Sequence, residues 1–275
     1  MKIFVGLTAT LLFSPLAAFA QNIPAGGKDY IQQRYDNLNQ GGAVDLEGCV
    51  NHLSSPSDVE SAFVKTMWVT FDPSLNGRTQ WLESGCTKAW TATDISTINA
   101  GDQGGSLGSF YQGHYFAYKT DVNIGTQANP NIESRYHEGR VAVSAGIPSG
   151  TFRYKIERDT STQNKWCNYL NNSANYCITL AGIGTGTVTN YLNYNFARYV
   201  TVGIESGNLQ HSFINNTKAS NIWFRNSSGT WGRIPSMSKA DNMYTTRPWS
   251  SIYAPTVTNS SGQVVTPDTI TFKNQ

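Results

Sequence analysis

The sequence predicts an all-β protein built as an antiparallel β-sandwich or jelly roll. From Phe63 onward, short runs of aromatic and β-branched residues alternate with clusters of Gly, Asn, Asp and Pro, the pattern of strands joined by turns. Charged residues form only 14% of the chain, against about 25% in a typical globular protein. Such a composition is common in exported β-proteins, and the spacing of the runs fits a sandwich. The predicted strands lie in MWVTF, TQWLES, YFAYKTDV, GRVAVSAGI, TFRYKIERD, KWCNYL, YCITLAGI, RYVTVGIES and NIWFRN.

The N-terminus, residues 1–20, has the organisation of a secretory signal. Lys2 provides a positive charge, Ile3–Leu12 an apolar stretch, and Ala18–Ala20 a small-residue cleavage site. We therefore expect a signal peptide and a secreted protein, either extracellular or periplasmic. No later segment has the about 20 consecutive apolar residues that a membrane span needs, so we expect no membrane partner.

The rest of the chain divides into an N-terminal segment, residues 21–60, and a single β-sandwich domain, residues 61–275. Within the segment, Lys28–Asn37 is predicted as one short helix and the remainder as irregular. The domain shows no fixed-period repeat and no clear linker, and its length suits one large all-β unit. Its last predicted strand is Thr269–Lys273. We expect a monomer.

Four cysteines make an even number in an oxidising compartment, where three pairings are possible. Cys167 and Cys177 lie in WCNYLNNSANYC, which is typical of a hairpin, so we expect a local disulfide there. That pairing leaves Cys49 with Cys86. The sequence has no CxxC unit, which argues against a zinc site.

The stretch WVTFDPSLNGRTQWLESG predicts two strands that carry acidic residues beside tryptophan. Successive side chains of a strand point to opposite faces, so Trp68 and Asp72 share one face while Val69 and its apolar neighbours face the core. In the second strand, Trp81 and Glu83 lie on one face. Carboxylates beside Trp on a strand face, in a protein with few charges, indicate a functional site.

Two further strands add candidates. In ARYVTVGIESGN, Thr201 and Glu205 share one face, and the residues of the other face are apolar. In GHYFAYKTD, the face with Tyr118 also carries His114 and Phe116, whereas Tyr115 and Lys119 point the other way. Either set could line a substrate groove, although core packing is the ordinary role of its apolar members.

These segments resemble the glutamic peptidases. WVTFD followed by WLESG is similar to the Trp-Val-x-x-Asp … Leu-Gln-x-Gly pattern of the eqolisins, with Glu83 at the position of their catalytic Gln. Neprosin-type glutamic peptidases carry a Glu there, in a strand reading Ile-Glu-x-Gly, which Leu82–Gly85 resembles more closely. Gly203–Glu205 is similar to the later strand that carries their second catalytic Glu. The resemblance covers roughly residues 60–235 and implies a concanavalin-like jelly roll.

The resemblance also implies residue roles. Glu83 and Glu205 match the catalytic pair, and Trp68 and Asp72 match the family's site-lining Trp and Asp. To these we add three substrate-lining residues from the neighbouring strand positions: Trp81, Tyr118 and Thr201.

Paired carboxyls suit peptide hydrolysis on physical grounds. Two such groups facing each other do not both ionise easily, so the pair shares a proton. The ionised member, assigned here to Glu205, takes a proton from the attacking water, and the protonated member, Glu83, donates to the carbonyl oxygen and to the leaving amine. The sequence thus predicts an acid-active endopeptidase with a polypeptide substrate and no cofactor.

Other functions are weighed against this one. A non-catalytic carbohydrate- or surface-binding module on the same scaffold, or a polysaccharide-degrading enzyme, would also use a face rich in Trp, Tyr and carboxylates. A net charge of +2 without a basic run gives no support for nucleic-acid binding. No GxSxG elbow is present, which argues against a serine hydrolase. We expect no metal site, because the histidines are scattered: His52, His114, His137 and His211.

Overall fold

The computed structural model describes residues 28–48, 63–71, 80–90, 93–94, 110–123, 125–126, 129, 131–140, 150–180, 194–207 and 213–274. Every regular element in these ranges is a β-strand, and the predicted all-β class is confirmed. Among the same residues there is no helix long and apolar enough to cross a membrane. The predicted signal peptide, Asp72 and Cys49 lie outside the described residues.

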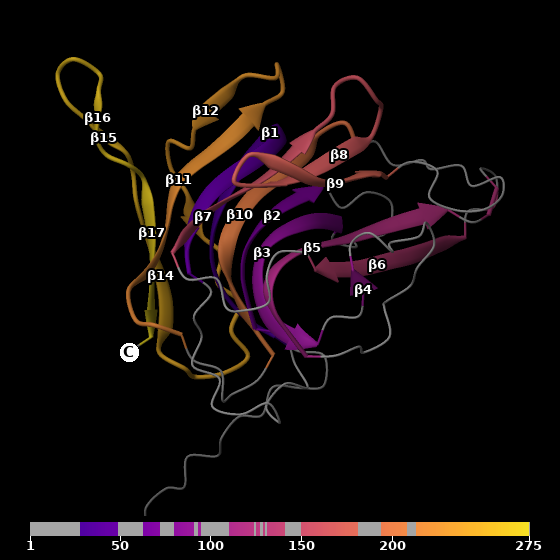
Figure 1. Ribbon diagram of the computed structural model, residues 1–275, viewed down its shortest axis with the longest axis horizontal. Coiled ribbons are helices and arrows are strands. Elements are labelled where there is room, and N and C mark those ends of the chain that lie inside the picture. Colours follow the sequence, from indigo (N-terminus) through magenta and orange to yellow (C-terminus); the bar gives the residue numbers. More distant parts are fainter. Residues whose placement is uncertain are drawn as a thin grey trace, which may run out of the picture.

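The strands, labelled as in Figure 1, are β1 (Asp29–Glu47), β2 (Phe63–Phe71), β3 (Gln80–Trp90), β4 (Thr93–Asp94), β5 (Phe110–Asn123), β6 (Ile132–Arg140), β7 (Thr151–Arg158), β8 (Lys165–Leu170), β9 (Ser173–Thr179), β10 (Ala197–Ser206), β11 (Thr217–Asn226), β12 (Trp231–Arg233), β13 (Ser238–Lys239), β14 (Trp249–Ala254), β15 (Val257–Thr258), β16 (Val264–Thr266) and β17 (Thr269–Asn274).

Strand β1 belongs to both layers of the sandwich. Its first part, from Asp29 to Asp36, pairs with β10, and its second part, from Gly41 to Leu46, pairs with β7 on one side and β11 on the other. The first layer has the order β1-β10-β2-β3-β5-β6, and the second has the order β9-β8-β7-β1-β11-β17-β14. Figure 1 shows β1 running between these two groups of strands. One long strand therefore connects both layers.

Gly41 allows β1 to pass close to the second layer. A Cβ atom at this position would lie 2.3 Å from the carbonyl oxygen of Ile156 in β7, and the residue has a φ of +150°. The pairing register of β1 also shifts at this point, between Asn39 and Gly41. Glycine is the residue that accommodates such a close backbone approach.

The main core lies between the two layers. Alternate residues of β2 and β10, such as Met67, Val69 and Val202, pack against residues of the second layer, such as Val44 and Ile156. This confirms the predicted core face of the MWVTF strand. The core also contains a buried ammonium group, that of Lys65 in β2. Its Nζ donates to backbone and side-chain oxygens at the end of β1 and the start of β11. Its acceptors are Glu47 O at 2.7 Å, Thr217 Oγ1 at 2.7 Å and Lys218 O at 2.8 Å.

The helix predicted over Lys28–Asn37 is wrong. Residues 29–37 belong to β1, where Asp29, Ile31 and Gln33 are buried on one side of the strand. The period-two pattern was hidden because two of these three inward residues are polar. Their partners come from distant parts of the chain: Asp29 pairs with Arg247, and Gln33 donates to Ser251. Tertiary contacts therefore decide the local structure.

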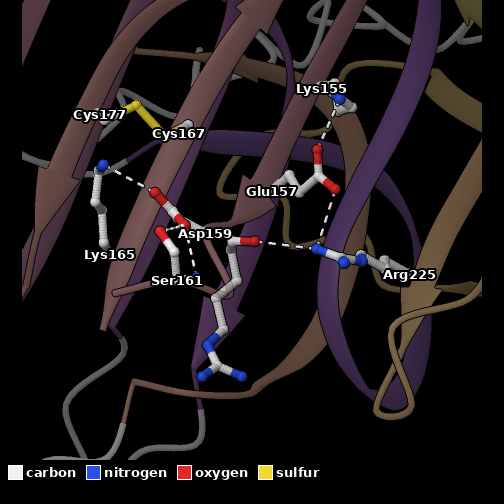
Figure 2. The surroundings of a disulfide bond; sticks show 9 residues. Lys155, Glu157, Asp159, Ser161, Lys165, Cys167, Cys177 and Arg225 are labelled. Atoms are coloured by element: carbon white, nitrogen blue, oxygen red, sulfur yellow. Dashed lines mark hydrogen bonds and ion pairs between the residues drawn. A yellow bond between two sulfur atoms is a disulfide. The ribbon is translucent and has the colours of Figure 1, made fainter. Parts of the chain in front are cut away.

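The predicted disulfide between Cys167 and Cys177 is confirmed, and it joins β8 to β9. In Figure 2 it lies near an ion-pair group on the same layer, in which Glu157 binds Lys155 and Arg225. Cys86 is also disulfide-bonded, and its predicted partner, Cys49, lies outside the described residues. The predicted final strand, Thr269–Lys273, is present as β17.

Candidate active site

The pairing register places the predicted catalytic residues on the face of the first layer that points away from the main core. We call this the outer face. Residues directly opposite one another on neighbouring strands share a face. Trp68 is opposite Thr201 of β10 and opposite Glu83 of β3. Glu205 is opposite Val64, which shares the face of Trp68 because the two are four positions apart on β2. Both glutamates therefore lie on the outer face.

Glu83 is almost completely buried, with 4% of its surface exposed. The Tyr115 hydroxyl, on the neighbouring strand β5, donates a hydrogen bond to Glu83 Oε1. Burial, followed by the charge of Glu83, raises the pKa of the Tyr115 phenol well above its usual value. The phenol therefore keeps its proton and acts as a fixed donor to the carboxylate.

Glu205 is 6% exposed and has two partners, Lys28 just before β1 and Tyr30 within it. Its Oε1 forms an ion pair with Lys28 Nζ. Tyr30, directly opposite Glu205 across the strands, has a strongly raised pKa. The causes are burial first, then the charges of Glu205 and Glu83 and a side-chain hydrogen bond to Glu205. A cation and a phenol thus both contact this carboxylate.

The two carboxylates are offset on the sheet. Glu83 is on β3 and Glu205 on β10, with β2 between them, and their positions differ by the four residues from Val64 to Trp68. In a flat sheet their Cα atoms would be about 10 Å apart across the strands and about 13 Å along them. Their side chains nevertheless share surroundings, because both charges raise the pKa of Tyr30 and of Tyr115.

Between the two glutamates the outer face carries a row with two glycines. Gly203, Thr66 and Gly85 are opposite one another on β10, β2 and β3. A Cβ at Gly85 would lie 2.3 Å from Lys65 O, and one at Gly203 would lie 2.5 Å from Ile31 O. Neighbouring backbone thus approaches too closely for any side chain. The row continues on both sides, with Gln32 of β1 opposite Gly203 and Tyr115 of β5 opposite Gly85.

Apolar side chains surround this polar group. Val64, Trp68, Tyr115 and Ala117 form a buried cluster separate from the main core, against which Tyr30 and Trp81 pack. The Tyr30 and Trp68 rings meet edge to face, with centroids 6.3 Å apart. An apolar boundary of this kind penalises charge and makes hydrogen bonds to the carboxylates stronger than they would be in water.

Most of the predicted site residues in the described part of the chain come together, and one does not. Trp68, Trp81 and Thr201 lie on the outer face with the glutamates. Tyr118 is opposite Leu82 and is buried in the main core, on the other side of the sheet from Glu83. It does not reach the candidate site, because side chains alternate along β5 and the residue opposite Glu83 is Ala117. Asp72 is outside the described residues.

Three residues of the site were missed: Lys28, Tyr30 and Tyr115. The first two were missed because the start of β1 was predicted as a helix. Tyr115 was recognised as facing away from Tyr118, but the sequence alone did not reveal which of the two faces adjoins Glu83. A strand reading of Lys28–Asn37 would have provided the signal, since Lys28, Tyr30 and Gln32 then alternate with Asp29 and Ile31.

In the described part of the chain, no three His, Cys, Asp or Glu side chains are grouped so that they could hold a metal ion. The groups gathered on the outer face are carboxyls, phenols and an ammonium group. No protein-family model matches the chain, and no curated protein matches it significantly in sequence. Its function is accordingly inferred from the geometry of the outer face.

Proposed function

We propose that the protein is a secreted, acid-active endopeptidase of the glutamic type, with Glu83 and Glu205 as its catalytic carboxyls. The observation that carries this proposal is the burial of two carboxylates on one sheet face. The charges of both raise the pKa of the same two phenols, Tyr30 and Tyr115. Perturbed titratable groups gathered in this way are typical of acid–base sites. The resemblance of WLESG and GIE to glutamic-peptidase strands points to the same residues.

The surroundings of the two glutamates suit different roles. Glu205, beside the Lys28 ammonium, is suited to act as the carboxylate that removes a proton from water while the water oxygen attacks the peptide carbonyl. Glu83 then acts as the acid and donates its proton to the carbonyl oxygen. When the tetrahedral intermediate breaks down, the C–N bond is cleaved, the proton held by Glu205 passes to the leaving amine, and one hydroxyl group of the intermediate returns a proton to Glu83. The reaction consumes one water and restores both carboxyls.

Two features support an exported protein. The N-terminal residues have the pattern of a signal peptide, and the Cys167–Cys177 disulfide is typical of an oxidising compartment. Acid activity follows from the mechanism, because one of two carboxyls must hold a proton. Activity should therefore fall as the pH rises towards neutrality.

The proposal is tested by digestion of a denatured protein substrate from acid to neutral pH. Glu205→Gln removes the base and should abolish cleavage, whereas Glu83→Gln recreates the eqolisin arrangement and should retain part of it. Glu157→Gln is the matched control, because Glu157 is an ion-paired glutamate of the second layer, away from the outer face. Full activity of Glu205→Gln would overturn the proposal.

Glycan binding is the second candidate. The observation in its favour is that Tyr30 and Trp81 are only partly buried beside the carboxylates, where aromatic rings could stack on a sugar. Retention on a polysaccharide column without cleavage of protein would favour a binding module. Release of reducing sugar, lost in Glu205→Gln, would instead favour a polysaccharide-degrading enzyme.

A further inference from the structure

A buried ion pair lies directly behind the Glu205 end of the site. Asp29 and Ser206 are opposite each other across β1 and β10, next to the Tyr30–Glu205 pair. Because strand residues alternate faces, Asp29 and Ser206 point to the side away from the outer face. The side chain of Asp29 is 0% exposed and pairs with Arg247, with Nη2 and Oδ2 2.6 Å apart.

Asp29 is held by a set of donors from one loop. Its Oδ1 accepts hydrogen bonds from the backbone N–H groups of Tyr244 at 2.6 Å and Thr245 at 3.1 Å. Its Oδ2 accepts from Thr245 Oγ1 at 2.5 Å and from Arg247 Nε at 3.1 Å. Burial alone raises the pKa of Asp29, but the bonds from Thr245 and Arg247 outweigh it and leave the pKa below its usual value. The group therefore stays ionised.

Arg247 connects the two strands that carry the site. The Nη2 atom that binds Asp29 of β1 also donates to Ser206 Oγ of β10 at 3.3 Å. Its guanidinium lies over the Trp249 ring, with 3.8 Å from the carbon to the ring centroid, and this contact limits its motion. The flanking residues point the other way: Lys28 and Tyr30 on one strand and Glu205 on the other.

We propose that Asp29 and Arg247 form a positioning pair for the Glu205 carboxyl and its partners. The inference rests on the proposed function, because it assigns Glu205 a catalytic role. The pair fixes the relative position of the ends of β1 and β10, and thereby the approach of Lys28 and Tyr30 to Glu205. Asp29 and Ser206 point to the side of the sheet opposite to Glu205, so the effect of the pair passes through the backbone. Small misplacements of catalytic groups cost large factors in rate.

The chain offers a matched control for this pair. Asp268 is equally buried, at 0% exposed, and pairs with Arg233 at 2.7 Å. It also accepts a hydrogen bond from the backbone N–H of Ile222 at 2.8 Å, within the second layer. Asp268→Asn therefore removes the same kind of interaction at a distance from the outer face. Comparison with Asp29→Asn separates positioning from general destabilisation.

Kinetics of peptide cleavage give the first measurement. Asp29→Asn should lower kcat about 100-fold with little change in KM, whereas Asp268→Asn should leave kcat unchanged in the temperature range where it is folded. Arg247→Lys keeps the positive charge but loses the planar guanidinium that joins Asp29 to Ser206. This variant should therefore remain folded and also have a lower kcat. Equal kcat in Asp29→Asn, Arg247→Lys and Asp268→Asn would overturn the proposal.

A second measurement does not need activity, so it separates this inference from the proposed function. In protein labelled with ¹³C at the glutamate carboxyls, the signals of Glu205 and Glu83 are assigned by their disappearance in Glu205→Gln and Glu83→Gln. The Glu205 signal should move in Asp29→Asn and in Arg247→Lys, but not in Asp268→Asn, and the Glu83 signal should stay in place in all three. An unmoved Glu205 signal overturns the positioning role. Absence of cleavage by the wild type, with a moved signal, overturns only the peptidase function.

Discussion

Tyr115 donates its phenolic hydrogen to the carboxylate of Glu83 from the neighbouring strand, and both side chains are buried. The pair connects β5 to β3 on the outer face, and Tyr115 lies directly opposite Gly85 of the glycine row. A buried carboxyl oxygen needs such a donor, because an unsatisfied polar group is costly away from water. The hydroxyl of Tyr115 should therefore matter for both stability and activity.

Tyr115→Phe removes this donor while keeping the ring. We expect the free energy of unfolding to fall by about 1–3 kcal/mol, the cost of leaving a buried acceptor without its partner. Cleavage should fall as well, because Glu83 loses a contact that fixes its orientation. Urea unfolding and peptide kinetics measure the two effects. Tyr253→Phe is the control, since its hydroxyl donates to Ile234 O at 2.8 Å and should affect stability alone.

Gly85→Ala should be poorly tolerated although alanine adds only one methyl group. The new Cβ would lie 2.3 Å from Lys65 O and 2.6 Å from Thr66 Cα, so the backbone of β2 must shift. We expect a loss of more than about 3 kcal/mol, in the range of severe overpacking. Gly232→Ala provides the contrast, because its Cβ would meet only Phe224 Cε1 at 3.6 Å. Similar thermal unfolding of the two variants would contradict the close approach at Gly85.

Much of the fold follows from sequence periodicity. The alternation in MWVTF separates Trp68 from Met67 and Val69, and the structure places the latter two in the core. The local disulfide was also accessible, because Cys167 and Cys177 lie within one hairpin. Both patterns involve residues that are close together in the sequence, so they can be recognised from a single sequence.

The N-terminal part of the site was not accessible in this way. Asp29 occupies a core position only because Arg247, far away in the sequence, neutralises it. The sequence does not reveal this pairing, so an aspartate at this position does not predict the buried side of a strand. The choice between Tyr115 and Tyr118 likewise depends on how β5 pairs with β3, and pairing register is a tertiary property.

Lys65→Met should weaken the connection between the two layers. Methionine fills a similar volume, but it leaves Glu47 O, Thr217 Oγ1 and Lys218 O without this donor. We expect a loss of about 1–3 kcal/mol from the unsatisfied acceptors. The loss should be smaller at pH 5 than at pH 8, because burial lowers the pKa of Lys65 to about 7 and the fold therefore disfavours its charged form. Lys239→Met, at an exposed position, should change stability by less than about 0.5 kcal/mol. Equal unfolding midpoints in urea would contradict a structural role for this ammonium.

His114 should set a lower pH limit for the folded protein. Burial lowers its pKa from 6.5 to about 4, and its Nδ1 lies 2.5 Å from the Tyr154 hydroxyl between the two layers. Between about pH 6.5 and pH 4 the unfolded chain thus binds a proton at this residue that the folded protein does not. Stability therefore rises with pH across this window and is lost as the pH falls through it.

His114→Gln keeps a polar group near Tyr154 but does not titrate. The difference in free energy of unfolding between wild type and variant should change by up to about 3 kcal/mol in favour of the variant between pH 7 and pH 4. Urea unfolding at both pH values measures this change, and other acidic groups cancel in the comparison. A difference that is the same at both pH values would show that His114 is not the titrating group. His114→Gln should also keep peptidase activity for longer than the wild type at pH 4, because no protonation at position 114 then favours the unfolded chain.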